Sequence, residues 1–408
     1  MRISVKNGLL ISKQNHRIIT AFYEEGLVRG FQIEHSDKKS VLGNIYVGKV
    51  HNIVKNIHAA FVEFQKGMTG YLSLDDSILP IHTDGAIDES RVLIGDEIIV
   101  QVKKEAMKTK PPTLSGSIEL SGKYLILTGG KRQISISKKI QDKTRRTELK
   151  KCLEDITCEL PVGFICRTNS EYAKDEAIKE EAEILIRQYR DIVEFGKHKC
   201  KHSLLYEAPP AYLESMDDFY LKKDAKIMTD SEEIYKTILQ EFSTHPWKKT
   251  YDVSLWNEEN GKMTVVYNME RALKRAMQEK VWLKSGAYLV IQPTEALVSI
   301  DVNTGKAISK KKDAQASFLK CNLEAAKEIV YQIRLRNLSG IIIVDFIDLK
   351  NENDRQTLLK ALKEELIKDP IPARLIDMTP LGLVEITRKK VRKSLREQWD
   401  FDDDAQDT

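Results

Sequence analysis

Alternating apolar and polar positions dominate the first part of the chain. Residues 1–35 alternate in this way and predict a β-meander, and residues 37 to about 118 continue as short strands separated by glycine and other turn residues. Many evenly spaced strands of this length are typical of a small five-stranded barrel of the OB type. Such barrels bind single-stranded nucleic acid through aromatic side chains and a neighbouring basic groove. Phe61 and Tyr71 are candidates for stacking, and Lys49 and Lys110 for phosphate contacts, although an aromatic side chain in a barrel more often packs in the core.

Beyond residue 118 the pattern becomes a mixture of short strands and helical periods. Apolar residues at helical spacing predict helices over residues 174–195 and 231–242. Residues 252–255 and 263–266 resemble short strands and predict a pair of strands.

The most informative pattern lies between residues 296 and 348. Two apolar strands end at Asp301 and Asp345, and a helical stretch separates them. The apolar residues of that stretch recur at the 3,4-spacing of one buried face: Leu319, Leu323, Ala326, Val330 and Ile333. Strand, helix and strand in this order predict a βαβ unit with parallel strands, and ligands of open α/β sheets gather at the carboxyl ends of such strands.

Two carboxylates at those strand ends predict a site for Mg²⁺, a cation that prefers oxygen ligands and keeps several waters for chemistry. An aspartate at a strand end is also a common turn or cap residue. Four consecutive aliphatic residues precede Asp345, however, and a carboxylate in such a run is costly unless it is paired or bound to a metal. The pattern therefore favours metal-dependent hydrolysis.

Length and composition set the broad class. A chain of 408 residues is long for one core and predicts several domains, and its hydrophobic content of 41% is ordinary for a globular protein. No apolar run is long enough to cross a membrane and residues 1–5 do not resemble a signal peptide, so we expect no membrane span. Five dispersed cysteines without a CxxC pair favour the reducing cytoplasm.

Charge is unevenly distributed although the net charge is only +4. Residues 103–151 and 388–393 are strongly basic, and an acidic tail follows residue 398. Concentrated positive charge attracts polyanions, of which nucleic acid is the usual one, whereas a solvated charged face is the alternative for the first basic stretch.

Four motifs in order resemble the ribonuclease E/G family of bacterial endoribonucleases. They are Ser-Ile-Asp-Val-Asn (299–303), Asn-Leu-Glu-Ala-Ala (322–326), Arg-Leu-Arg-Asn-Leu (334–338) and Ile-Val-Asp-Phe-Ile-Asp (343–348). The resemblance implies a multidomain α+β and α/β fold with four parts and a tail. These are an RNase-H-like subdomain (1–36 and 206–275), an OB-fold RNA-binding domain (37–118), a mixed 5′-monophosphate sensor domain (119–205), a DNase-I-like catalytic βαβ domain (276–397) and the acidic tail (398–408).

The resemblance also implies roles for individual residues. Asp301 and Asp345 match the metal-binding aspartates, and Asn303 matches the residue that orients this catalytic site. Three residues match positions at which the OB domain holds single-stranded RNA: Phe61, Tyr71 and Lys110. Four more match the pocket that recognises a 5′-monophosphate: Gly122, Ile126, Arg167 and Thr168.

The sequence departs from the family pattern in three respects. It contains no CPxC motif, the family's zinc link between subunits, so we expect Mg²⁺ but no zinc and a monomer or looser homodimer. Tyr71 stands where phenylalanine is common in the family, and Lys138 and Lys139 replace a pair of arginines. These changes keep the type of side chain, although lysine lacks the planar fork with which arginine binds a phosphate.

The sequence thus predicts a Mg²⁺-dependent endoribonuclease that cleaves single-stranded RNA in ribosomal RNA maturation or messenger RNA turnover and leaves 5′-phosphate products. Two alternatives stay open: a non-catalytic protein that binds RNA ends, and a Mg²⁺-dependent phosphodiesterase or DNA nuclease on the same catalytic unit. Retention of both aspartates with Asn303 disfavours the first, and an OB domain suited to single strands disfavours the second.

Overall fold

The computed structural model describes residues 6–37, 40–75, 80–83, 91–106, 110–154, 156, 160–219, 225–244, 252–305 and 314–399. Most of the predicted acidic tail, residues 400–408, lies outside these described residues. The chain divides into two compact units. Unit 1 comprises Met1–Asp37, Lys222–Ser243 and Thr250–Thr408, and unit 2 comprises Lys38–Leu221 and Thr244–Lys249. The finer division into four domains stays a prediction.

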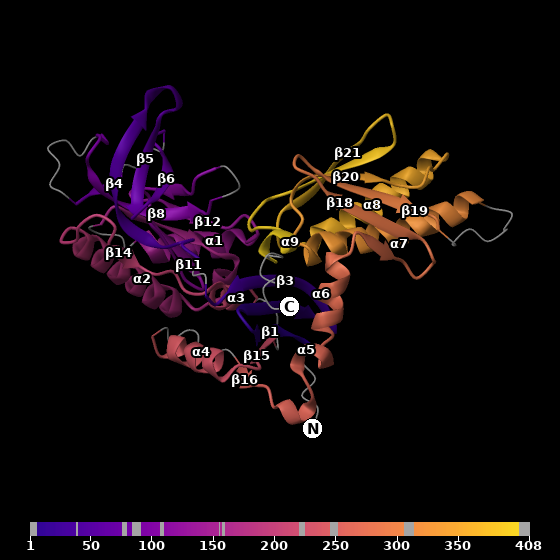
Figure 1. Cartoon of the computed structure of the whole chain (residues 1–408), viewed down its shortest axis with the longest axis horizontal. Helices are drawn as coiled ribbons and strands as arrows, with labels where there is room; N and C mark the ends of the chain where they lie inside the picture. Colours follow the sequence, from indigo (N-terminus) through magenta and orange to yellow (C-terminus); the bar gives the residue numbers. More distant parts are fainter. Residues whose placement is uncertain are drawn as a thin grey trace. The chain divides into compact units, whose positions relative to one another are not determined.

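A closed barrel forms the first half of unit 2 (Figure 1). Its strands are β4 (Ile45–Val54), β5 (Ala59–Gln65), β6 (Met68–Ser73), β9 (Thr113–Ser115) and β8 (Glu97–Lys104), joined in that order, and β8 pairs again with β4 to close the ring. The short strands β7 (Ile81–His82) and β14 (Leu204–Tyr206) extend the sheet, and η1 (Lys55–Ile57) connects β4 to β5. Alternate side chains, among them Tyr46, Phe64 and Val100, fill the interior. A five-stranded barrel in a mixed α/β protein confirms the predicted class and is consistent with an OB-like domain.

The second half of unit 2 is a four-stranded sheet in the order β10 (Glu119–Ser121), β11 (Leu125–Gly129), β13 (Val162–Cys166) and β12 (Ile134–Ile136). It packs against α1 (Lys143–Glu154) and α2 (Asp175–Gly196), while η2 (Thr168–Tyr172) follows β13 and α3 (Ala211–Phe219) follows β14. The helix predicted over residues 174–195 is α2, whose buried residues face Leu125, Leu127 and Phe164 of the sheet.

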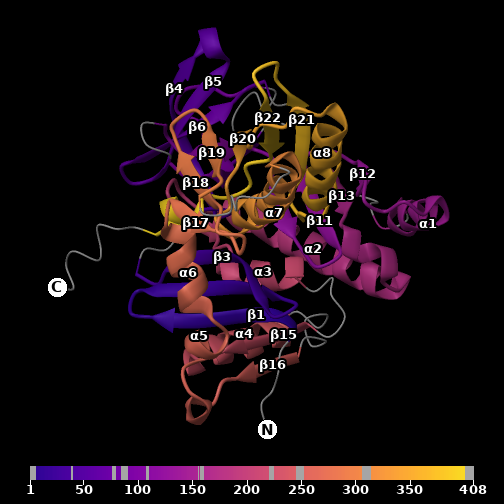
Figure 2. The same ribbon diagram turned by 90° about the vertical axis from the view of Figure 1, so that its right-hand side faces the viewer.

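Unit 1 begins with a sheet made from two distant segments of the chain. Its order is β16 (Asp252–Leu255), β15 (Ala225–Thr229), β1 (Asn7–Gln14), β2 (Arg17–Glu24) and β3 (Leu27–His35), and β1 runs parallel to β15. Figure 2 shows α6 (Met269–Met277) beside this sheet, with α4 (Glu232–Thr244) and α5 (Met263–Val266) nearby. Two further short helices among the described residues are η4 (Glu258–Asn260) and α9 (Leu395–Gln398).

The strand predicted over residues 263–266 is wrong, because this segment is the helix α5. The N–H groups of Val266 and Tyr267 donate to the carbonyls four residues earlier, and Tyr267 is buried against Tyr23 and Trp256. The β propensity of Val265 and Val266 is a weak preference, and here both side chains are exposed, so packing of the neighbouring aromatic residue decides the local structure.

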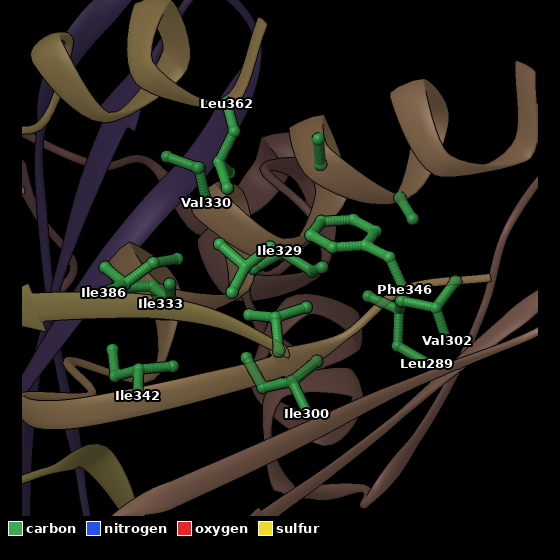
Figure 3. Packing of buried hydrophobic residues seen from close by; sticks show 14 of the residues in the cluster. Leu289, Ile300, Val302, Ile329, Val330, Ile333, Ile342, Phe346, Leu362 and Ile386 are labelled. Carbon is green, nitrogen blue, oxygen red and sulfur yellow. The ribbon is translucent and has the colours of Figure 1, made fainter. Parts of the chain in front are cut away.

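The second sheet of unit 1 carries the paired aspartates. Its order is β17 (Lys280–Trp282), β18 (Tyr288–Pro293), β19 (Val298–Asn303), β20 (Gly340–Asp345), β22 (Leu383–Arg388) and β21 (Ala373–Met378). The helices α7 (Ala314–Leu335) and α8 (Glu352–Ile367) cover one face, where Ile300, Ile342 and Ile386 meet Ile329 and Leu362 (Figure 3). The predicted helix is α7, in which Ala326, Val330 and Ile333 are buried while Leu319 and Leu323 are partly buried.

A buried ion pair holds the end of the internal strand β22. The Arg388 guanidinium donates from Nε to Asp369 Oδ2 at 2.8 Å and from Nη2 to Asp369 Oδ1 at 3.3 Å, and both side chains are almost fully buried. Its Nη1 also donates to Asn337 Oδ1 and to the Leu338 carbonyl, each at 2.9 Å. Because the carboxylate and two further oxygens satisfy the guanidinium, its burial is tolerated only as long as all of them are present.

Among the helices of the described ranges, none combines the length and the hydropathy needed to cross a lipid bilayer.

Candidate functional site

The two aspartates face each other on neighbouring strands. Strands β19 and β20 are parallel, and Asp301 and Asp345 are direct partners in their register. Val298, Ile300 and Val302 point into the core, so the alternating residues Ser299, Asp301 and Asn303 lie on the opposite face of the sheet. The described helices α7 and α8 pack only on the core face, and both carboxylates are therefore exposed on the open face.

Asn303 orients one of the two carboxylates. Its Nδ2 donates to Asp301 Oδ2 at 2.6 Å, a hydrogen bond that fixes the side chain of Asp301 and satisfies one of its oxygens. Partial loss of hydration raises the pKa of Asp345, and the negative charges of Asp301 and Asp348 raise it further. The site therefore concentrates negative charge and favours a cation between its carboxylates.

The donor set fits a hard divalent cation that keeps much of its water. Two carboxylates from neighbouring strands are the kind of ligand set that holds Mg²⁺ through one or two protein oxygens. Within the described residues, no third His, Cys, Asp or Glu completes a protein cage around Asp301 and Asp345. A soft-ligand site of the zinc type would need cysteine or histidine ligands at this position.

A buried asparagine that the sequence reasoning missed holds the loop after Asp345. Asn322 on α7 is fully buried; its Nδ2 donates to the Ile347 carbonyl at 2.7 Å, and its Oδ1 accepts from the Ile347 N–H at 3.1 Å. The Asn322 amide thus makes the two hydrogen bonds that a neighbouring strand would make with Ile347. These bonds fix the backbone two residues after Asp345. A polar residue on the buried face of a helix was the signal in the sequence, because such a group must find a partner.

The predicted RNA-holding residues lie on one wall of the barrel. Phe61 on β5 and Tyr71 on β6 are direct cross-strand partners, and their half-buried rings make an edge-to-face contact with centroids 6.2 Å apart. Tyr71 also pairs with Thr113, and its N–H donates to the Pro112 carbonyl at 2.7 Å. Lys110 is exposed just before this segment, so the structure places it on the chain that borders Tyr71.

The other basic candidate of the barrel, Lys49, is half-buried on β4, where it pairs with Glu63 and Glu97 in the neighbouring strands. The Glu63 carboxylate itself lies 3.0 Å from His51 Nε2 and 3.0 Å from His202 Nε2, and the role of Lys49 as a phosphate contact stays a prediction.

The predicted phosphate-pocket residues converge in the second half of unit 2. Arg167 follows β13, and its Nη1 donates to the Gly122 carbonyl at 2.7 Å. Thr168 Oγ1 lies 3.2 Å from Ser137 Oγ, a residue that the sequence reasoning did not select. Ile126 is half-buried on β11 opposite Ile165 and shares the face from which Arg167 extends. A guanidinium and hydroxyl groups are donors suited to binding a phosphate.

A buried carboxylate shapes the turn that carries Gly122. Glu181 of α2 is fully buried and accepts hydrogen bonds from the N–H groups of Lys123 (2.5 Å), Tyr124 (2.8 Å) and Leu125 (3.0 Å). A Cβ at position 122 would lie 2.3 Å from Glu181 Oε1, so only glycine fits there. The turn is thereby held in place, and the Gly122 carbonyl stays directed at Arg167.

The site residues therefore form three groups. The structure brings the two aspartates and Asn303 together in unit 1, and it brings the two aromatics and the phosphate-pocket residues together as separate groups in unit 2. The roles assigned to these groups stay predictions, although each set of neighbours is in place.

The chain belongs to the ribonuclease E/G family, because the model of the Ribonuclease E/G family matches residues 119–391, well over half of its length. This membership confirms the family and the class of enzyme that the motifs predict. Individual relatives are similar to this chain over almost its whole length. The chain is 32% identical to Ribonuclease G of Haemophilus influenzae, covering 95% of this chain and 80% of that protein. It is 31% identical to Ribonuclease G of Escherichia coli strain K12, with the same two coverages.

A longer relative matches as well. Ribonuclease E of Nostoc sp. is 30% identical over 95% of this chain, which spans 56% of that protein. The region of similarity contains all three groups of site residues described above.

Proposed function

We propose that this protein is an endoribonuclease that hydrolyses phosphodiester bonds of single-stranded RNA at the Asp301–Asp345 pair, with Mg²⁺ as its cofactor. The observation that carries the proposal is the pairing of the two carboxylates on the open face of the second sheet, with Asn303 bonded to Asp301. Membership of a family whose relatives are named ribonucleases G and E supports RNA as the substrate.

The chain's own residues would hold the cation and orient the carboxylates that bind it. Asp301 and Asp345 would hold the cation, and Asn303 keeps the Asp301 carboxylate in one orientation so that its free oxygen is presented to that cation. When bound, Mg²⁺ supplies neutralisation of the attacked phosphate and a water of lowered pKa. Cleavage on the 3′-oxygen side of the phosphate gives 5′-phosphate and 3′-hydroxyl products.

Unit 2 would bind and orient the RNA strand. Phe61 and Tyr71 offer ring faces and edges to bases, and Lys110 offers a cation to the backbone, which together restrict the strand's orientation. Arg167 and Thr168 would bind a 5′-terminal monophosphate and favour such RNAs over those with a triphosphate. We propose that such an enzyme acts in ribosomal RNA maturation or in messenger RNA turnover.

Five dispersed cysteines without a CxxC pair support a reducing compartment, and we propose the cytoplasm. A homodimer stays a prediction, and sedimentation of the full chain at several protein concentrations tests it.

The experiment uses a short AU-rich RNA with a 5′-monophosphate, incubated with the wild type, Asp301→Asn or Asp345→Asn, in Mg²⁺ or in EDTA. We expect cleavage only by the wild type in Mg²⁺, because each substitution removes a negative ligand while keeping the side chain's shape. Binding of the same RNA by both variants should persist, since unit 2 is unchanged. Cleavage at the wild-type rate by either variant would show that the site lies elsewhere.

The same assay separates the alternatives. RNA binding without cleavage by the folded wild type would identify a protein that guards RNA ends. Equal cleavage of the DNA oligonucleotide of the same sequence would identify a general phosphodiesterase, because an RNA-specific enzyme can read the 2′-hydroxyl.

A further inference from the structure

A second group of side chains lies on the open face of the catalytic sheet, two strands away from the paired aspartates. Trp282 of β17 is the cross-strand partner of Tyr288 of β18, and Tyr288 is the partner of Asn303 of β19. In the next row, Lys280 pairs with Val290, and Val290 pairs with Asp301. The buried residues of β17 and β18, such as Val281 and Leu289, point to the core, so these rows lie on the same face as the aspartates.

The rings and the cation of this group touch one another. The Trp282 and Tyr288 rings are tilted by 56° with centroids 5.1 Å apart. Lys280 Nζ lies 3.6 Å from the Tyr288 centroid and 4.4 Å from that of Trp282. Such cation–π contacts hold the ammonium group and the rings in a fixed arrangement.

An exposed tryptophan on a sheet face is costly to leave in water without a reason. Trp282 keeps 55% of its surface exposed, although β17 is a short edge strand and Leu283 beside it is buried. Neither the core nor the cation site uses this ring. A large aromatic face next to a lysine has the chemistry that binds one nucleotide: the base stacks on the ring, and the ammonium group contacts the phosphate.

We propose that Trp282, Tyr288 and Lys280 form a stacking subsite for a base of the single-stranded RNA substrate, next to the cleaved bond. The inference rests on the proposed function, and it adds a contact made by the catalytic unit itself. Two strand spacings separate Trp282 from Asn303, about 10 Å. This distance corresponds to roughly three stacked nucleotide steps of ~3.4 Å, or fewer in an extended strand. The base bound here is therefore one to three nucleotides from the scissile phosphate.

The subsite would do two things for the reaction. It fixes the strand on the open face of unit 1, so that the phosphate is delivered to the carboxylates with a restricted orientation. It also accepts any base, because every base has a π-face, so the preference it creates concerns single-stranded character rather than sequence.

The test combines protein variants with abasic RNAs. Wild type, Trp282→Ala and Trp282→Phe are assayed for KM and kcat on one substrate series, in which a single abasic nucleotide is placed at each of the three positions on either side of the cleaved bond. We expect one abasic position to raise the wild-type KM by about tenfold, the loss of one stacked base. Trp282→Ala should show that higher KM on the intact RNA and no further change with the abasic RNA, while Trp282→Phe keeps most of the sensitivity.

A matched control removes an exposed aromatic side chain that also lies beside a lysine, elsewhere in the molecule. Phe195 of α2 is 50% exposed, with Lys199 Nζ 4.2 Å from its ring centroid. Phe195→Ala should keep the wild-type response to every abasic RNA, which separates the loss of a specific subsite from a general effect of removing an exposed aromatic side chain.

Three results would overturn the inference: an unchanged KM of Trp282→Ala on the intact RNA, a further rise in the KM of Trp282→Ala on the abasic RNA as large as that of the wild type, or a loss of the abasic response in Phe195→Ala as complete as in Trp282→Ala. Failure of the proposed function is distinguishable, because the wild type would then leave all these RNAs uncut. In that case, quenching of the Trp282 fluorescence by the intact RNA, read as the difference from Trp282→Phe, would still support the subsite, and its absence would refute it.

Discussion

Removal of the Asn322 side chain tests whether the loop after Asp345 is positioned by α7. In Asn322→Ala, the Ile347 N–H and carbonyl lose their partners at 3.1 and 2.7 Å, in a place from which the buried Asn322 side chain excludes water. Two lost hydrogen bonds at about 1 kcal/mol each, with a further contribution from the unpaired groups, predict a loss of roughly 2–3 kcal/mol in unfolding free energy.

The effect on catalysis should exceed the effect on folding. Asp345 lies two residues before Ile347, and a displacement of about 1 Å of a reacting group can reduce the rate by ~100-fold. We therefore expect kcat to fall by about two orders of magnitude in protein that is still folded at 25 °C, with KM for RNA nearly unchanged.

The matched control lies on the same helix. Gln332 is also fully buried on α7, where its Nε2 donates to Glu328 at 2.7 Å and its Oε1 accepts from Arg336 Nε at 2.7 Å. Gln332→Ala should lose a similar amount of stability, because it also loses two hydrogen bonds, yet it lies about 15 Å further along the helix and should cleave normally. Denaturant unfolding and single-turnover cleavage measure both quantities. An Asn322→Ala protein that loses stability but keeps the wild-type kcat would refute the positioning argument.

Two further predictions concern other parts of the molecule. Asp369→Ala leaves the Arg388 guanidinium buried without its carboxylate and should cost about 3–5 kcal/mol in unfolding free energy, whereas Lys368→Ala on the exposed surface should change it by less than about 0.5 kcal/mol; thermal unfolding compares the two. Arg167→Ala removes the guanidinium that lies at the Gly122 carbonyl and should abolish a preference of roughly 10- to 100-fold for 5′-monophosphate over 5′-hydroxyl RNA, while cleavage of the 5′-hydroxyl RNA continues. A preference that persists in Arg167→Ala would place the phosphate pocket elsewhere.

The pairing of Asp301 with Asp345 could be predicted from sequence because two simple rules act together. An apolar run gives the strand and its end, and the right-handed crossover through a helix makes the two strands parallel. The carboxyl ends then meet at one edge, as the register of β19 and β20 shows. Period-2 alternation even assigns Asn303 to the face of Asp301, since it lies two residues further along the same strand.

Other features depended on packing that sequence patterns do not contain. Helical periodicity says that Asn322 is on the buried face of α7, but it cannot say which loop its amide will bind. Val265 and Val266 favour a strand by their local propensity, but the burial of Tyr267 overrides that preference and the segment is helical. Glu181 lies in an amphipathic helix, and its sequence context is that of any surface glutamate. Only the structure shows that its carboxylate binds the turn at Gly122.

The sheet that joins β1 to β15 has a consequence for the order of events during synthesis. Asn7 pairs with Ala225, so the parallel partner of β1 is translated only after unit 2 has been made. At about 5–20 residues per second, the meander β1–β3 waits roughly 10–40 s with one strand edge unpaired, while the barrel and the four-stranded sheet of unit 2 can fold behind it. Folding of unit 2 in this interval would compact the long insertion between β3 and β15, and it would thereby lower the entropy cost of pairing β1 with β15. A substitution that destabilises the barrel should for this reason lower the yield of folded unit 1.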